Sequence, residues 1–311
     1  MKAHHIGKSR SAAAPWQRRA LQVLSGAVLI AAVPLAHATV YTLQDLNSTL
    51  TTDSSTGITS WTVDGVNQLY QQWFWGRIGP SGGESSLGSA LNFLHGSATD
   101  TNFVIDPHKD TLSLAYGDAD LTNSSFLVTL KLSLLGGGTG SKLSDLGTQG
   151  AMYNKTLTFT NLTNTERTYH AFQYSDFDLG GNSANDTATA TNANTIVQRG
   201  GGMILTDVAA ANVTPKWEIG PFSSILASLN DGSPTTLSDS GSGMVGDVTY
   251  AREWDFTLQP YGSPNNTFAL SLDQHISVPD PGTILLLGAG MLGLAGASRR
   301  KWRKNQSMDQ G

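Results

Sequence analysis

Residues 125–134 read Ser-Phe-Leu-Val-Thr-Leu-Lys-Leu-Ser-Leu, and every second residue from Phe126 to Leu134 is large and apolar. Successive side chains of a β-strand point to opposite faces, so this period of two places the apolar side chains on one face. The stretch therefore predicts a β-strand with one buried face, which is typical of a sheet in a β-sandwich.

The rest of the central region repeats this pattern in shorter pieces, separated by turns such as Asp64-Gly65. Further strands are expected at 57–63, 102–105, 111–116, 153–161, 168–177, 195–197, 203–205, 246–258 and 267–276. One short helix is expected within 221–229, and 184–195 is interpreted as an exposed loop or an edge strand. No second domain boundary is evident. We predict an all-β fold, a single β-sandwich of about 240 residues spanning 39–277.

Residues 1–38 have the three parts of a secretion signal. Basic residues without any acid precede an apolar run at 20–33, and Ala36-His37-Ala38 supplies the small residues that signal peptidase requires. We predict a signal helix, cleavage after Ala38 and a mature protein that begins at Thr39. The alternative is an uncleaved anchor. Arg18-Arg19 also raises the twin-arginine route, although the rest of that motif is poor and the general secretory route is favoured.

The C-terminal region has a similar three-part arrangement. Its motif is Val278-Pro279-Asp280-Pro281-Gly282, extended to residue 283, and a predicted transmembrane helix follows at 283–298. A basic end at 299–304 places that side in the cytoplasm and the central domain outside, while 305–311 is expected to be disordered. The apolar segment is shorter than the roughly 20 residues of a comfortable span. This favours transient anchoring over a plain tail anchor, which is the alternative.

The residues of this tail resemble the PEP-CTERM sorting signal of exported proteins of Gram-negative bacteria. The usual Pro-Glu-Pro of that family stands here as Pro279-Asp280-Pro281. The resemblance implies processing by exosortase, a membrane-embedded transpeptidase-like enzyme, at residues 278–304. It also implies a protein held transiently in the inner membrane and then placed at the cell surface or in the extracellular matrix. The label "ice-binding protein C-terminal domain" is also attached to such tails, and it describes the tail alone.

The charge of the central region is hidden by its two ends. Ten of the 19 Lys and Arg residues but only two of the 24 acids lie in residues 1–38 and 280–311, so residues 39–279 carry a formal charge of −13. Such a domain is not expected to bind nucleic acid, which requires a basic face. It is expected to attract cations. The absence of cysteine excludes thiol catalysis, Cys-ligated zinc and iron–sulfur clusters.

A calcium site is one interpretation of the acids and amides around residue 180. Asp176, Asp178, Asn182 and Asp186 offer the hard oxygen ligands that Ca²⁺ prefers, although their spacing is not that of an EF-hand. The alternative is a strand end with Tyr174, Asp176 and Asp178 facing solvent, followed by an Asx-rich turn. No other cofactor is expected.

A glycan-contact site is one interpretation of the aromatic stretch at 71–77. Trp73 and Trp75 can stack on sugar rings, and Arg77 can hydrogen-bond to hydroxyl groups. The alternative, favoured for most of these residues, is packing in the sandwich core, with Trp73 and Trp75 on one side of the strand and Phe74 on the other.

The function predicted from these features is a non-enzymatic surface or matrix protein, sorted by exosortase and associated with extracellular polysaccharide or biofilm. A first alternative is a carbohydrate-binding module or a secreted carbohydrate-active enzyme, in which Glu84 pairs with Glu253 or Asp255 as glycosidase carboxylates do. A second alternative is a purely structural envelope protein. The expected partners are signal peptidase, exosortase, a polysaccharide, and the membrane before the tail is processed.

Overall fold

The computed structural model describes residues 38–101, 108–120, 123–137 and 149–278 of the chain. The signal helix, the tail from Pro279 onward and the strand expected at 102–105 lie outside these residues. No helix within the described part is both long and apolar enough to cross a membrane.

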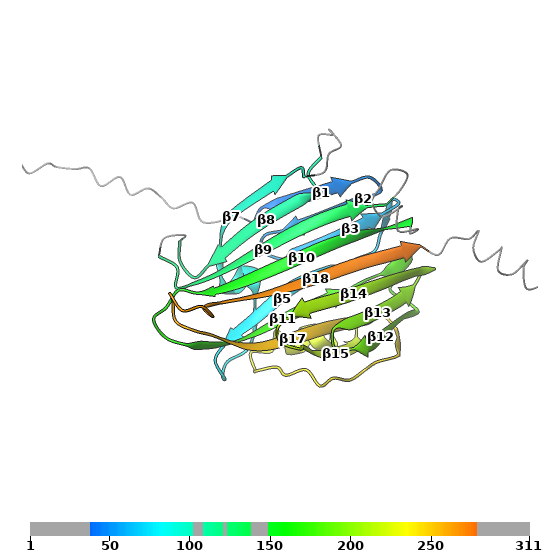
Figure 1. Ribbon diagram of the computed structural model, residues 1–311. Helices are drawn as coiled ribbons and strands as arrows, with labels where there is room; N and C mark the ends of the chain where they lie inside the picture. Colours follow the sequence, from blue (N-terminus) through cyan, green and yellow to red (C-terminus); the bar gives the residue numbers. More distant parts are fainter. Residues whose placement is uncertain (1–37, 102–107, 121–122, 138–148, 279–311) are drawn as a thin grey trace, which may run out of the picture. The chain divides into compact units, whose positions relative to one another are not determined.

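The described residues form two antiparallel sheets that pack as layers (Figure 1). Sheet A has the order β1-β2-β3-β5-β11-β17-β15, with the short β4 beside β3 and β6 beside β5. Its strands are β1 (Val40–Asp45), β2 (Ser48–Asp53), β3 (Gly57–Val63), β4 (Val66–Asn67), β5 (Gln71–Ile78), β6 (Ser85–Ser86), β11 (Arg167–Asp176), β15 (Lys216–Pro221) and β17 (Val248–Leu258).

Sheet B has the order β16-β12-β13-β14-β18-β10-β9-β8-β7. Its strands are β7 (Asn92–Thr99), β8 (Thr111–Gly117), β9 (Phe126–Gly136), β10 (Gln149–Asn161), β12 (Asp186–Asn192), β13 (Thr195–Gly200), β14 (Met203–Ala211), β16 (Met244–Gly246) and β18 (Thr267–Val278). The helices of the described part are short: α1 (Leu87–Ala90), the 3₁₀ helix η2 (Leu179–Gly181) and α2 (Ser224–Ser228).

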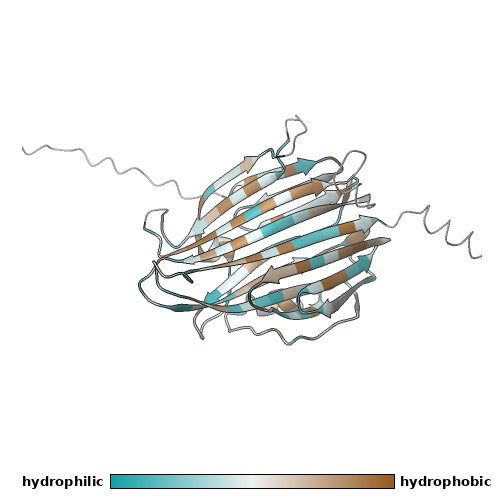
Figure 2. Ribbon diagram, in the orientation of Figure 1, coloured by the Kyte–Doolittle hydropathy of each residue, from teal (hydrophilic) through white to brown (hydrophobic). Residues whose placement is uncertain are grey.

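The period-two pattern explains the central strands of sheet B. Phe126, Val128, Leu130, Leu132 and Leu134 of β9 are all buried, whereas Lys131 and Ser133 between them are exposed. Figure 2 shows the same alternation of apolar and polar residues along neighbouring strands. The prediction of an all-β fold made of two antiparallel sheets is confirmed.

Several strands have no clear sequence signal. β1, β2, β7 and β15 were not predicted, and 184–195 contains the strand β12, which pairs with both β13 and β16. Most of these segments, though not β15, are rich in Thr, Ser and other polar residues, so their strand conformation depends on pairing with neighbours more than on an apolar face.

The face of sheet A that points away from sheet B is also covered. Ile225 of α2 is buried, as are Leu229 and Leu237 of the segment that follows, named here the 229–240 loop. Three glutamates accept backbone N–H groups of this loop: Glu84 from Thr235, Glu253 from Leu237 and Glu218 from Ser238. These bonds fix the loop on the sheet, and the outer face of sheet A is therefore a partly buried surface.

Candidate functional site

Three carboxylates meet at one end of sheet A. Strand β11 ends at Asp176, and β17 begins at Val248, next to Asp247. The two strands pair antiparallel with Asp176 opposite Thr249, so the end of one strand lies beside the start of the other. Oxygens of Asp176, Asp178 and Asp247 consequently lie within 4.8 Å of one another. We name these three residues the acidic cluster.

The acidic cluster has no basic partner in the described part of the chain. None of its three carboxylates forms an ion pair with another described residue. Asp176 is 1% exposed, and its side-chain bond within the described residues is a long one, 3.4 Å from the Tyr174 hydroxyl. Burial, reinforced by the charges of Asp178 and Asp247, raises the pKa of Asp176 to about 7. Burial and Asp247 also raise the pKa of Asp178.

This arrangement changes the ligand set expected from the sequence. Asp176 and Asp178 come together as expected, but the third carboxylate is Asp247, because β17 pairs with β11. Asp186 has a different role, since its Oδ2 accepts bonds from the Leu179 N–H and from Gln198. The Asn182 side chain accepts the Ala184 N–H in an Asx turn.

The alternative that placed this strand end in solvent is wrong for two of its residues. Tyr174 is fully buried and Asp176 nearly so, while Asp178 is half-buried. The Tyr174 ring packs edge-on against Trp75 at a centroid distance of 6.0 Å. The covered outer face of sheet A is the physical reason, since the period-two pattern alone cannot show that both faces of a strand are buried.

An exposed pair of aromatic rings borders the acidic cluster. Tyr70 is 58% exposed and Phe222 is 45% exposed, and their rings meet edge to face with centroids 5.9 Å apart. The backbone N–H of Tyr70 donates to the carbonyl of Asp176, and that of Phe222 donates to the carbonyl of Asp247. The backbone thus fixes both rings beside the two strands that supply the carboxylates.

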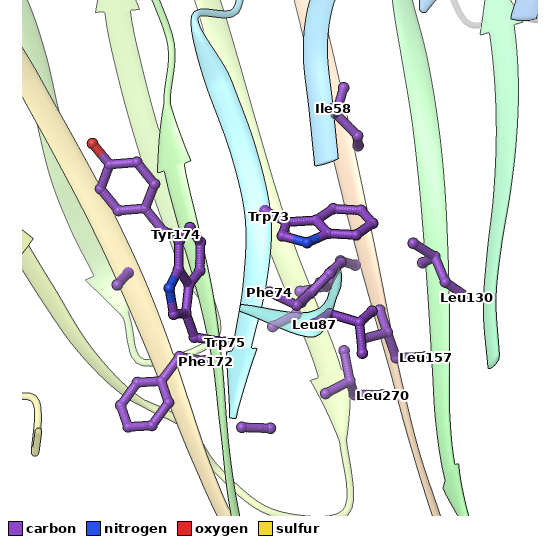
Figure 3. Packing of buried hydrophobic residues seen from close by; sticks show 14 of the residues in the cluster. Ile58, Trp73, Phe74, Trp75, Leu87, Leu130, Leu157, Phe172, Tyr174 and Leu270 are labelled. Atoms are coloured by element: carbon purple, nitrogen blue, oxygen red, sulfur yellow. The ribbon is translucent and has the colours of Figure 1, made fainter. Parts of the chain in front are cut away.

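The aromatic residues expected to contact glycan are mostly core. Trp73 is 1% exposed, and a Cβ on Gly57 would lie 2.5 Å from its ring, so the ring fits only because position 57 is glycine. In Figure 3, Trp73 and Phe74 lie on the side of Leu130 and Leu157, whereas Trp75 lies on the opposite side with Tyr174. Simple alternation predicts that Trp73 and Trp75 lie on the same side of the strand. In the structure they lie on opposite sides.

Trp75 and Arg77 lie close to the remaining interior space. Trp75 is 5% exposed, and its Nε1 donates to Asn230 of the 229–240 loop. Arg77 is 8% exposed and forms a 2.9 Å ion pair with Glu84. Both residues line a largely apolar cavity of about 340 Å³, whereas Trp73 does not. A ligand in this cavity could therefore contact Trp75 and Arg77 but not the ring of Trp73.

A second group of titratable residues lies on β11, β15 and β17. His170 Nδ1 lies 2.5 Å from Asp255, and Lys216 Nζ lies 2.9 Å from Asp255 and 3.5 Å from Glu253. We name these four residues the paired cluster. Burial raises the pKa of Glu253 to about 7. Burial also acts to raise the pKa of Asp255, but hydrogen bonds from Lys216 and His170 outweigh it and hold that pKa below its ordinary value.

The carboxylates considered as a glycosidase pair have structural partners. Glu84 is occupied by Arg77 and by the Thr235 N–H, and Glu253 by Lys216 and the Leu237 N–H. Both side chains are fully buried. They hold the 229–240 loop on sheet A.

Three of the predicted processing residues, Ala38, Thr39 and Val278, lie at the edges of the described part. Thr39 donates its N–H to Ser54 Oγ and accepts the Ser54 N–H, so the sandwich extends to the predicted cleavage point after Ala38. Cleavage itself stays a prediction. Ala36 and the motif residues Pro279, Asp280, Pro281 and Gly282 lie outside the described residues.

Residues 277–301 match the family model of the PEP-CTERM protein-sorting motif. The predicted sorting signal is thereby confirmed, and it marks the chain as an exported protein sorted by exosortase. The sequence matches no curated protein.

Three solved structures match the chain at low similarity. They are a bacterial glucoamylase complexed with acarbose (10% identity, 79% of this chain and 33% of that chain, TM-score 0.49), HI1317 (10%, 77% and 93%, 0.36), and the family GH92 α-mannosidase BT3965 from Bacteroides thetaiotaomicron (11%, 79% and 30%, 0.30). The chain spans about a third of the length of the glucoamylase.

Proposed function

We propose that this exported protein is a non-enzymatic component of the cell surface or extracellular matrix that binds polysaccharide with the help of Ca²⁺. The observation that carries the proposal is the pair of exposed rings, Tyr70 and Phe222, fixed beside three carboxylates that have no basic partner among the described residues. Export and sorting by exosortase supply the location in which such binding is useful.

The chemistry of the two parts is complementary. Ca²⁺ takes six to eight oxygen ligands, so three carboxylates leave coordination positions for water or for the hydroxyl groups of a sugar. An aromatic ring offers a flat apolar surface on which the C–H face of a sugar ring can pack. The charge of −13 on residues 39–279 would repel an acidic polysaccharide, and a bound cation would reduce that repulsion locally.

The structural roles of Glu84 and Glu253 support a function without catalysis. Each accepts a backbone N–H of the 229–240 loop and is paired with a basic side chain. A glycosidase needs one carboxyl group to give up its proton and another to face the sugar or a water molecule. Two fully buried side chains that hold a loop are poorly placed for this work.

Calorimetry with the purified exported protein tests the calcium site first. After removal of metal with EDTA, Ca²⁺ should bind with a Kd of about 10⁻⁴ to 10⁻³ M, the range of extracellular modules. Asp178→Asn should weaken binding at least about tenfold, because it removes one charged ligand. Asp231→Asn is the matched control, since Asp231 lies in the 229–240 loop, outside the acidic cluster. Equal affinity in both variants would contradict the site.

Retention of the protein on beads carrying the secreted polysaccharide of the producing bacterium tests the second part. Binding should require Ca²⁺ and should be lost in Tyr70→Ala and Phe222→Ala. Tyr261→Ala is the control, because Tyr261 is 69% exposed but follows the other end of β17. Binding that survives EDTA, or that is lost only in Tyr261→Ala, would place recognition elsewhere.

A carbohydrate-active enzyme is the second candidate, and one observation favours it. Glu253 and Asp255 lie two residues apart on β17, and their pKa values are shifted in opposite directions. Such a split is typical of a general acid beside an ionised carboxylate. Hydrolysis of any polysaccharide by the wild-type protein, abolished in Glu253→Gln, would establish this function in place of the first.

A further inference from the structure

A lysine and a glutamine face each other in the middle of the core. Gln72 lies on β5 of sheet A and Lys155 lies on β10 of sheet B, and both side chains are fully buried. Lys155 Nζ contacts the Gln72 carboxamide at its oxygen. The two residues are 83 positions apart in the sequence, so only the packing of one sheet on the other brings them together.

The carboxamide of Gln72 is held at both ends. The Tyr153 hydroxyl donates to its Oε1 at 2.7 Å, and its Nε2 donates to Ser175 Oγ at 2.7 Å. Tyr153 lies two residues before Lys155 on β10 and is also fully buried. The carbonyl is therefore fixed, polarised by a phenolic O–H and presented to the lysine amine.

Lys155 forms no ion pair with any described residue. The nearby buried acid, Asp207, is committed to Arg252 at 2.7 Å and to the Tyr250 hydroxyl at 2.8 Å. Burial lowers the pKa of Lys155 well below its ordinary value, although the charge of Asp207 acts in the opposite direction. The rings of Tyr153 and Phe74, centred 4.9 Å and 5.9 Å from Nζ, fill much of the surrounding space. An uncharged amine in such surroundings is a nucleophile.

We propose that Lys155 Nζ and Gln72 Cδ become joined by an intramolecular isopeptide bond. The amine of Lys155 attacks Cδ, and the Tyr153 hydroxyl stabilises the negative charge that develops on Oε1. One proton of Nζ passes to Nε2, which lies 2.7 Å from Ser175 Oγ. The Cδ–Nε2 bond then breaks and ammonia leaves. One N–C bond forms, one breaks, and no oxidant or other reactant is needed.

Such a bond would connect the two sheets covalently. The chain has no cysteine, so the described sandwich has no disulfide to serve this purpose. A cross-link between distant residues restricts the unfolded chain and thereby favours the folded one. Unlike a disulfide, an amide is unaffected by reducing agents.

Mass spectrometry of the full-length protein, denatured after purification, tests the proposal. The expected mass is lower than that of the sequence by one ammonia. Trypsin should fail to cleave after Lys155, and a branched peptide should join the segments that contain Gln72 and Lys155. The loss of ammonia should be absent in Lys155→Met but kept in Lys131→Met, since Lys131 is an exposed lysine on the neighbouring strand β9.

Two further measurements make the outcome decisive. Tyr153→Phe keeps the ring but removes the hydroxyl, so the bond should form more slowly, as a time course of the mass would show. The wild-type protein decides the question even if variants fail to fold. An unmodified mass together with tryptic cleavage after Lys155 would overturn the proposal, and Lys155 would then be a buried lysine bonded to a glutamine.

Discussion

The acidic cluster and the paired cluster both include residues of β11 and of β17 or the residue before it, but only the paired cluster also includes a cation, Lys216 of β15. Each draws carboxylates from β17 or the residue before it, and each includes a residue of β11 or of the segment just after it. In the paired cluster, Lys216 and His170 lie beside Asp255, and Lys216 also reaches Glu253. The acidic cluster has no such partner within the described residues. The difference lies in the neighbouring side chains. Acids of sheet A that have a basic side chain beside them form ion pairs within the fold, whereas acids without one are available to bind a cation.

Calcium should produce the largest difference between the two clusters. We expect Ca²⁺ at a hundred times its Kd to raise the free energy of unfolding by about 2.7 kcal/mol, because it binds only the folded protein. Asp178→Asn should lower this gain to about 1.4 kcal/mol or less, because its affinity is at least about tenfold weaker, whereas Asp255→Asn should keep the gain. Urea unfolding with Ca²⁺ and with EDTA measures both. If Asp255→Asn loses the stabilisation by Ca²⁺, the metal binds at the paired cluster and not at the acidic cluster.

The acidic cluster should also make the metal-free protein sensitive to pH. The pKa of Asp176 is raised in the folded protein from an ordinary 3.8 to about 7. Between these values the folded state keeps a proton that the unfolded state has lost. The contribution of Asp176 to stability is therefore complete below about pH 3.8 and is lost as the pH rises to about 7, at up to roughly 1.4 kcal/mol per pH unit. Glu253 and Asp186, with raised pKa values, act in the same direction.

Urea unfolding at pH 5 to 8 in EDTA checks this trend, and Asp176→Asn should make it less steep. Ca²⁺ competes with protons for the same carboxylates, so its stabilising effect should grow as pH rises. If the stabilisation by Ca²⁺ is the same at pH 5 and pH 8, Asp176 is not a ligand of the metal.

Removal of the cation from the paired cluster should destabilise the protein. Lys216→Met leaves the fully buried Glu253 with the Leu237 N–H as its remaining described partner, and we expect a loss of about 1–2 kcal/mol. Lys131→Met is the control for loss of a lysine and should change stability little. The loss should be larger at pH 8 than at pH 5, because Glu253 is ionised only at the higher pH. No change at pH 8 would show that Lys216 does not support the cluster.

The smallest effect is expected at His170. Its partner Asp255 is partly exposed and keeps Lys216, so His170→Gln should cost about 0.5 kcal/mol at neutral pH. The urea midpoint at pH 7 measures this. A loss as large as that of Lys216→Met would show that the His170 contact, and not the lysine, holds the paired cluster together.

Local pattern predicted the strands that have an apolar face. The strands expected at 57–63 and 267–276 match β3 (Gly57–Val63) and most of β18 (Thr267–Val278) because their alternation is visible in the sequence. The aromatic stretch around Trp73 was predicted less well. Its side chains occupy both sides of β5, since the 229–240 loop buries the outer face of sheet A. A sequence pattern shows which residues are apolar but not what covers them.

The sequence predicted only part of the acidic cluster. Asp176 and Asp178 lie close in sequence, and their spacing is enough to indicate a cluster of oxygens. Asp247 could not be added, because only the register of β17 against β11 places it there. For the same reason, the sequence could not pair the ring of Tyr70 with that of Phe222.

The sequence by itself determined the all-β class and the sorted, exported character of the protein, since both depend on local order: alternation along strands, and a motif followed by an apolar segment and a basic end. The tertiary structure decided which charges have partners among the described residues. In the folded protein, Glu84 and Glu253 accept backbone N–H groups of the 229–240 loop. The acidic cluster has no basic partner among the described residues, and Lys155 contacts Gln72. These contacts join strands distant in the chain, and they depend on strand order and register, which local pattern does not fix.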